Sequence, residues 1–169
     1  MDDATLKLLT LCAVRIGGNS VDWNLIARAA SDGHLDSLWD GHVPARETPH
    51  ARATTAALLQ QGLRSLDEPR ARVATELDAA HRAGARLVTV LDEDYPVNLR
   101  HVPDLPPFLF ILGQHLPQDQ HAVAVVGTRQ ATDLGLRRAS RLATELAHHG
   151  VTIASGLARG VDTVAHHAA

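Results

Sequence analysis

The sequence of 169 residues contains one cysteine, and aromatic residues make up only 3% of it. A single cysteine, Cys12, cannot build a disulfide framework, which fits a reducing cytoplasm. The chain has no apolar stretch of about 18 residues and no signal-peptide pattern, so we expect a soluble, cytoplasmic protein. With 169 residues and 45% hydrophobic content, the chain can bury a core but holds at most one large domain and a small one.

Positive charge is not in excess, because the formal net charge is −3. The chain therefore lacks the global positive field that attracts nucleic acid, and any nucleic-acid site must be local. Histidine is abundant, but His148–His149 and His166–His167 are adjacent pairs, whose side chains point in different directions on a helix. No cysteine and no HExxH spacing accompanies them, so we expect neither a metal site nor a cofactor.

Residues 122–169 have the pattern of a strand, a loop, a helix, a second strand, a second loop and the start of another helix. Ala122–Val126 and Val151–Ala154 are short apolar runs typical of buried parallel strands. Thr132 is suited to cap the helix between them, which should end near Gly150. Two such loops at neighbouring strand ends place backbone N–H groups and helix N-termini at one edge of a sheet, which favours binding of a phosphate.

Both loops also carry a family pattern. The residues VGTR, a following helix and then SGLARGVDTVAHHAA resemble the pattern V-G-[ST]-R, helix, S-G-x-A-x-G-[IV]-D-x-x-A-H of the DprA/Smf family of DNA-processing proteins. The resemblance is strong over residues 65–169 and weaker over residues 1–64. The matching positions are Gly127, Thr128, Arg129, Ser155, Gly156, Ala158, Gly160, Asp162, Ala165 and His166.

The resemblance implies a function and a domain organisation. Members of the family bind single-stranded DNA and load RecA during natural transformation. The resemblance therefore implies a recombination mediator that protects incoming DNA, with RecA and a second copy of itself as partners of the complete protein. It also implies a sterile-alpha-motif-like module over residues 1–64, followed over residues 65–169 by the first part of an extended Rossmann-like domain.

The phosphate site that we expect is formed by the two loops. Arg129 is the side chain with the strongest position, because it follows a strand end where an anion would bind. Simpler interpretations remain open. The glycines can serve only to permit tight turns. Arg129 can form an ion pair with Asp133, and Arg141 can form one with Glu145 on a solvated helix face. The predicted DNA-binding residues are Gly127, Thr128, Arg129, Ser155, Gly156, Arg159 and Gly160.

The region before Ser65 is expected to be a small all-helical module, in which Gly17–Gly18 most simply ends the first helix. Beyond Ser65, the runs Arg86–Leu91 and Phe108–Leu112 add two strands to the predicted sheet. We therefore predict an α/β fold, with a Rossmann-like parallel sheet that is incomplete in this chain and follows the helical module.

Three functional interpretations compete. No Cys or Ser stands beside a His in either loop, so we expect a DNA-binding protein that is not an enzyme. The alternative is a nucleotide-binding enzyme similar to the lysine-decarboxylase-like phosphoribohydrolases, although their P-G-G-x-G-T-x-x-E motif is absent from the sequence. A truncated, inactive fragment is the third, since the sequence ends inside a helix that begins near Val161. We expect the chain, expressed alone, to behave as an incomplete domain in which the strand Val151–Ala154 is an uncovered apolar edge or lacks its next neighbour, and therefore promotes aggregation.

Overall fold

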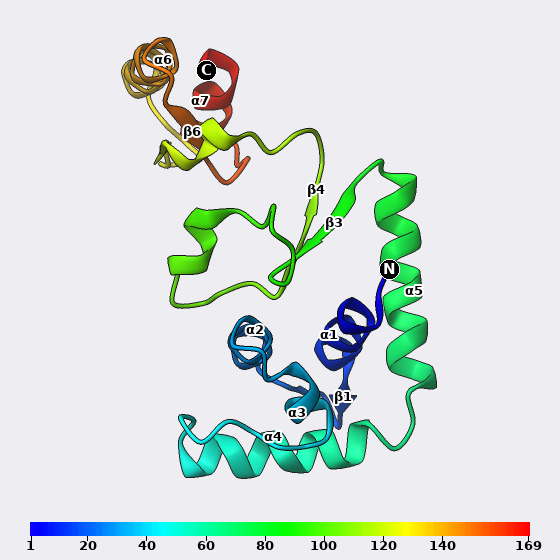
Figure 1. The fold of residues 1–169 in the computed structure, drawn as a ribbon. Helices are drawn as coiled ribbons and strands as arrows, with labels where there is room; N and C mark the ends of the chain where they lie inside the picture. Colours follow the sequence, from blue (N-terminus) through cyan, green and yellow to red (C-terminus); the bar gives the residue numbers. More distant parts are fainter. The chain divides into compact units, whose positions relative to one another are not determined.

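The computed structural model describes residues 1–169 and divides them into two compact units, Met1–Gln114 and His115–Ala169, each with its own core. The first unit contains α1 (Asp3–Ala13), β1 (Arg15–Ile16), β2 (Asn19–Ser20), α2 (Trp23–Ser31), α3 (Leu35–Trp39), α4 (Pro49–Gly62), α5 (Asp67–Arg82), β3 (Arg86–Thr89), the 3-10 helix η1 (Val97–His101) and β4 (Phe108–Ile111). The second unit contains the 3-10 helix η2 (Pro117–Gln120), β5 (Ala122–Ala124), α6 (Asp133–His148), β6 (Thr152–Ala154) and α7 (Val161–Ala168) (Figure 1). No helix is both long enough and apolar enough to cross a membrane.

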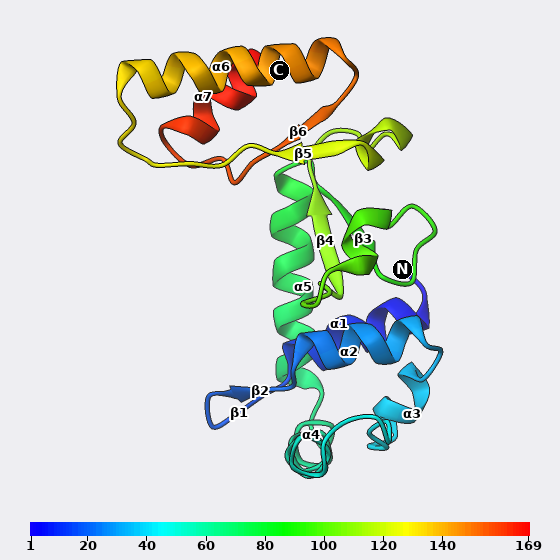
Figure 2. The same cartoon turned by 90° about the vertical axis from the view of Figure 1, so that its left-hand side faces the viewer.

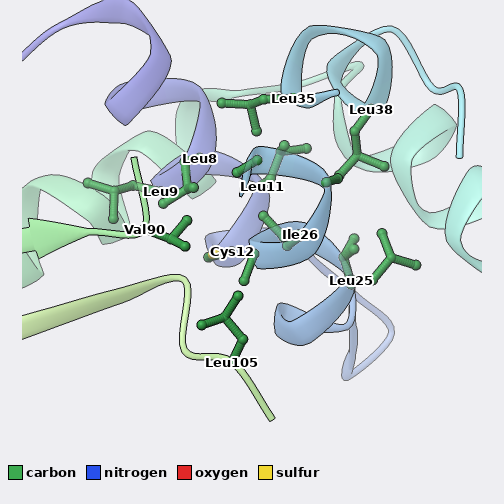
Figure 3. Close-up of a cluster of buried hydrophobic side chains, with 14 of the residues drawn as sticks. Leu8, Leu9, Leu11, Cys12, Leu25, Ile26, Leu35, Leu38, Val90 and Leu105 are labelled. Carbon is green, nitrogen blue, oxygen red and sulfur yellow. The ribbon is translucent and has the colours of Figure 1, made fainter. Parts of the chain in front are cut away.

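The core of the first unit is built around α1. Leu8 and Leu11 of α1 are fully buried, as are Ile26 of α2, Leu38 of α3 and Leu59 of α4. Figure 3 shows the side chains of α1, α2 and α3 directed toward one another. Each such side chain contributes about 1.5–3 kcal/mol when it is removed from water, so this apolar cluster holds the helices together.

We predict an all-helical N-terminal module, and this prediction is wrong, because the module also contains a β-hairpin. α1 ends at Ala13, and the following residues form the antiparallel hairpin β1–β2 (Figure 2). Gly17 and Gly18 make its turn with φ values of 56° and 85°. A two-residue hairpin turn of this kind needs positive φ at both positions, which glycine adopts without strain. Gly17–Gly18 is therefore a hairpin turn and does not end a helix.

The predicted four-stranded parallel sheet is not formed. β3 pairs with β4 in antiparallel orientation, and this pair is a separate two-stranded sheet. A parallel pairing needs a crossover connection, usually with an α-helix, whereas the connection here contains only η1 and returns the chain in the opposite direction. The Tyr95 hydroxyl donates to the Pro106 carbonyl at 2.7 Å, and the Arg100 guanidinium donates to the Val90 carbonyl at 3.1 Å. These bonds fix the connection and with it the strand direction.

The division between the compact units falls after Gln114 and not at Ser65. α5, β3 and β4 belong to the first unit because their apolar side chains enter its core. Val73 of α5 and Val88 of β3 lie in the same cluster as Leu8. The assignment of residues 1–64 to a sterile-alpha-motif-like module and of residues 65–169 to the first part of an extended Rossmann-like domain stays a prediction.

The second unit is a small α/β structure. β5 and β6 pair in parallel, as predicted, but β5 is exposed along its length and not buried. α6 packs against α7 and against β6 (Figure 2). Its core consists of Val125, Ala143, Ile153 and Ala165. The cap predicted for α6 is also confirmed, since Thr132 Oγ1 accepts a hydrogen bond from the Gly135 N–H at 3.2 Å.

Candidate functional site

Two loops follow the strands of the second unit, the first over residues 125–132 and the second over residues 155–160. Because β5 and β6 are parallel, with Ala124 opposite Ala154, both loops begin at the same edge of the sheet. Ligands of α/β proteins bind at this carboxyl edge. The fold therefore brings together the predicted residues Gly127 to Arg129 with the predicted residues Ser155 to Gly160.

The two loops interlock through glycines. Gly160 has a φ of 87°, and a Cβ atom there would lie 2.3 Å from the Thr128 carbonyl oxygen and 2.9 Å from Arg129 Cα. The Val161 N–H donates to that same Thr128 carbonyl at 3.3 Å. A Cβ at Gly127 would lie 2.7 Å from Val161 Cγ2. These glycines thus permit close packing of one loop against the other, in addition to the turns that they allow.

Asp162, which was not among the predicted site residues, joins both loops. Its Oδ2 accepts from the Gly156 N–H at 3.1 Å, and its Oδ1 accepts from the Gly127 N–H at 3.4 Å. The residue is 5% exposed. Asp162 stands in the family pattern, but sequence spacing does not reveal that one carboxylate reaches N–H groups 35 and 6 residues away.

The pKa of Asp162 is the balance of two opposing effects. Burial raises this pKa, but hydrogen bonds from the Ser155 side chain and from backbone N–H groups of both loops lower it, and the net pKa lies below the ordinary value. The carboxylate is therefore ionised at neutral pH. The Ser155 hydroxyl also lies 2.6 Å from the Val125 carbonyl oxygen, so its single proton has two acceptors.

An internal anion thus occupies the position between the two loops where a phosphate was expected. The N–H groups of Gly127 and Gly156 already donate to the Asp162 carboxylate. The side chains of Arg129 and Arg159 remain available, because both are exposed and neither forms an ion pair. A ligand anion would therefore meet the arginines first.

All ion pairs of the structure lie within the first unit. The alternative pairs Arg129–Asp133 and Arg141–Glu145 are consequently not formed. Residues 115–169 carry five arginines against four carboxylates, whereas the whole chain has a net charge of −3. The local excess of positive charge therefore lies in the second unit. The five arginines are Arg129, Arg137, Arg138, Arg141 and Arg159.

The structure has no candidate metal site. No group of three or more His, Cys, Asp or Glu side chains gathers in a way that could hold a metal ion. Asp119, the other carboxylate of the second unit with a lowered pKa, accepts hydrogen bonds from the Leu116 N–H and the Thr152 hydroxyl at 2.7 and 2.9 Å. Its hydrogen bonds fix the entry into β5 and contact the start of β6, so its role is structural.

The second unit belongs to the class of α/β structures in which parallel strands present interlocked loops and unpaired arginines at one edge. Comparison with known proteins identifies the family. The family model of DNA recombination-mediator protein A matches residues 86–169. Protein Smf of Escherichia coli (strain K12) is 37% identical over 115 residues, which are 68% of this chain and 31% of that protein. The chain belongs to the DprA/Smf family of DNA-processing proteins, as its loop residues had indicated.

Other relatives match shorter parts of the chain. Protein Smf of Synechocystis sp. (strain PCC 6803) is 36% identical over 94 residues, which are 53% of this chain and 24% of that protein. The DNA processing protein DprA of Streptococcus pneumoniae (strain R6) is 37% identical over 81 residues, which are 48% of this chain and 28% of that protein. The chain thus spans less than a third of the length of these three curated relatives.

Proposed function

We propose that the second unit binds the backbone of single-stranded DNA. In the complete protein, this binding would serve a recombination mediator that protects incoming DNA and assists RecA loading during natural transformation. The observation that carries the proposal is the placement of two unpaired arginines. Gly160, the residue after Arg159, lies against the backbone of Arg129, so the two guanidinium groups extend from neighbouring positions at the carboxyl edge of the β5–β6 sheet.

Arginine suits a phosphate ligand for a geometric reason. Its planar fork donates two parallel hydrogen bonds to phosphate oxygens and keeps its charge at any physiological pH. The N-terminus of α6, a helix of 16 residues, adds positive potential beside the first loop. We propose direct contacts from Thr128, Arg129 and Arg159, supported by the loop shape that Gly127, Ser155, Gly156 and Gly160 maintain.

The proposed role is non-catalytic. Neither loop contains a His that could act as the general base for Ser155. The Ser155 hydroxyl forms hydrogen bonds with the Val125 carbonyl and the Asp162 carboxylate. Asp162 also accepts from the N–H groups of Gly127 and Gly156, so these contacts hold the second loop against the first strand end. Backbone contacts by arginine also carry no sequence information, so we propose binding without base preference.

Titration of fluorescently labelled oligo-dT with the full chain tests this proposal. We expect saturable binding that weakens linearly as log salt rises, because bound arginines release counterions from the strand. Unlabelled nucleoside monophosphates should compete poorly, and labelled oligonucleotide incubated with protein and magnesium should stay intact. Tight monophosphate binding without oligo-dT binding, or protein-dependent cleavage, would favour a nucleotide-processing enzyme.

The partners belong to the complete protein and need their own test. We propose that it forms a homodimer and contacts RecA directly. Sedimentation of the complete protein, alone and with RecA, should show a dimer and a mixed complex. A complete protein that remains monomeric and sediments independently of RecA would contradict this part of the proposal while leaving the DNA site intact.

A further inference from the structure

Leu157, in the second loop, stands out in two respects. It is the most exposed large hydrophobic side chain of the chain, at 81%. It is also the only residue other than glycine with a positive φ, at 55°, a conformation that disfavours side chains with a Cβ. Exposure and backbone conformation both make leucine unfavourable at this position in the free protein.

The neighbours of Leu157 fix it there. On either side, the N–H groups of Gly156 and Ala158 donate to the Asp162 carboxylate, and the Ala158 carbonyl accepts from the Thr163 hydroxyl at 2.8 Å. The backbone at Leu157 is therefore held between two anchored residues. The side chain belongs to neither hydrophobic core, so it does not stabilise the second unit.

We propose that Leu157 packs against a nucleobase of a single strand whose phosphates are bound by Arg129 and Arg159. This inference rests on the proposed function and adds a base contact to it. An apolar side chain next to arginines matches the alternation of bases and phosphates along a strand. Base faces are accessible in a single strand and stacked inside a duplex, so the contact gives preference for single-stranded DNA without reading sequence.

The composition of the second unit supports this assignment. Single-strand binding proteins usually stack bases on aromatic rings, but residues 115–169 contain no Phe, Tyr or Trp. An aliphatic surface beside the arginines is what this unit offers to a base. Leu157 follows directly after the second loop's Gly156 and precedes Arg159 by two residues, which places it within the proposed site.

The test compares oligo-dT with an abasic sugar–phosphate chain of the same length, using anisotropy titrations of the full chain. Leu157→Ala removes three carbons, so we expect oligo-dT affinity to fall about tenfold, which corresponds to about 1.4 kcal/mol. Binding of the abasic chain should not change. Leu157→Met should retain near wild-type affinity for oligo-dT. Leu142→Ala is the matched control, since Leu142 is 52% exposed on α6 and should leave both titrations unchanged.

Leu157→Gly separates this role from a structural one. Glycine adopts positive φ without strain, so the variant should unfold at a higher temperature than the wild type. It should nevertheless bind oligo-dT about tenfold more weakly, like Leu157→Ala. A residue that only shapes the loop would not move stability and binding in opposite directions.

Each other outcome has a definite meaning. If Leu157→Ala binds oligo-dT as tightly as the wild type, the base contact is refuted and the proposed DNA function stands. If the variant loses affinity equally for the abasic chain, Leu157 acts on the phosphate site and the base contact is again refuted. If the wild type binds neither ligand, the proposed function itself fails.

Discussion

Replacing Arg129 with alanine should weaken DNA binding without weakening the fold. The guanidinium is exposed and forms no ion pair within the protein, so its removal leaves no partner unsatisfied. A hydrogen bond to a charged group is worth about 1.5–3 kcal/mol. Loss of the phosphate contact should therefore lower the affinity for oligo-dT by roughly 10- to 150-fold. The slope of log affinity against log salt should decrease in magnitude by about 0.7, the value for one phosphate contact on a single strand.

Arg141→Ala is the control for this experiment. Arg141 is also exposed and unpaired and lies on α6, so its loss changes the net charge of the second unit by the same amount. Anisotropy titrations at several salt concentrations should show a large change for Arg129→Ala and a small one for Arg141→Ala. Equal losses would mean that only net charge matters. An unchanged affinity and slope for folded Arg129→Ala would refute the site.

The remaining predictions concern the stability of the second unit. Gly160→Ala places a Cβ 2.3 Å from the Thr128 carbonyl oxygen, so it should lower the midpoint of thermal unfolding, measured by circular dichroism. Gly150→Ala is the control and should lower it far less, because its Cβ would meet open space and only the positive φ would be strained. Thr132→Ala removes the cap of α6 and should cost about 1 kcal/mol in urea unfolding. The pKa of Asp162 is lowered from 3.8, so its stabilising contribution is complete above that pH and is lost as pH falls below 3.8; Asp162→Asn should abolish this part of the acid sensitivity.

The local structure of the second unit could be predicted from the sequence, because its signals act over short distances. The Thr132 cap, the periodic apolar face of α6 and the strand at Ala122 each depend on residues that lie close together in the sequence. The family motif adds the positions of both loops. Sequence patterns of this length were sufficient to predict parallel β5 and β6 and the placement of Arg129 and Gly160 together.

The first unit shows what such patterns cannot determine. A short apolar run is consistent with a parallel or an antiparallel strand, and the orientation of β3 and β4 depends on a connection held by Tyr95 and Arg100. Gly17–Gly18 is compatible with both a helix end and a hairpin turn. The choice between them depends on whether flanking residues pair, which is a contact between segments and not a property of either segment.

Asp162 was missed for the same reason, and its position affects which ligand the site favours. The carboxylate is ionised and holds the Gly127 and Gly156 N–H groups that a terminal phosphate would otherwise use. A phosphomonoester carries close to two negative charges at neutral pH, whereas each phosphodiester of a strand carries one. The dianion would face the stronger repulsion from Asp162, while diesters can engage Arg129 and Arg159 at the outer side of the loops. The internal carboxylate therefore argues for a nucleic-acid strand, and against a mononucleotide, as the ligand of this site.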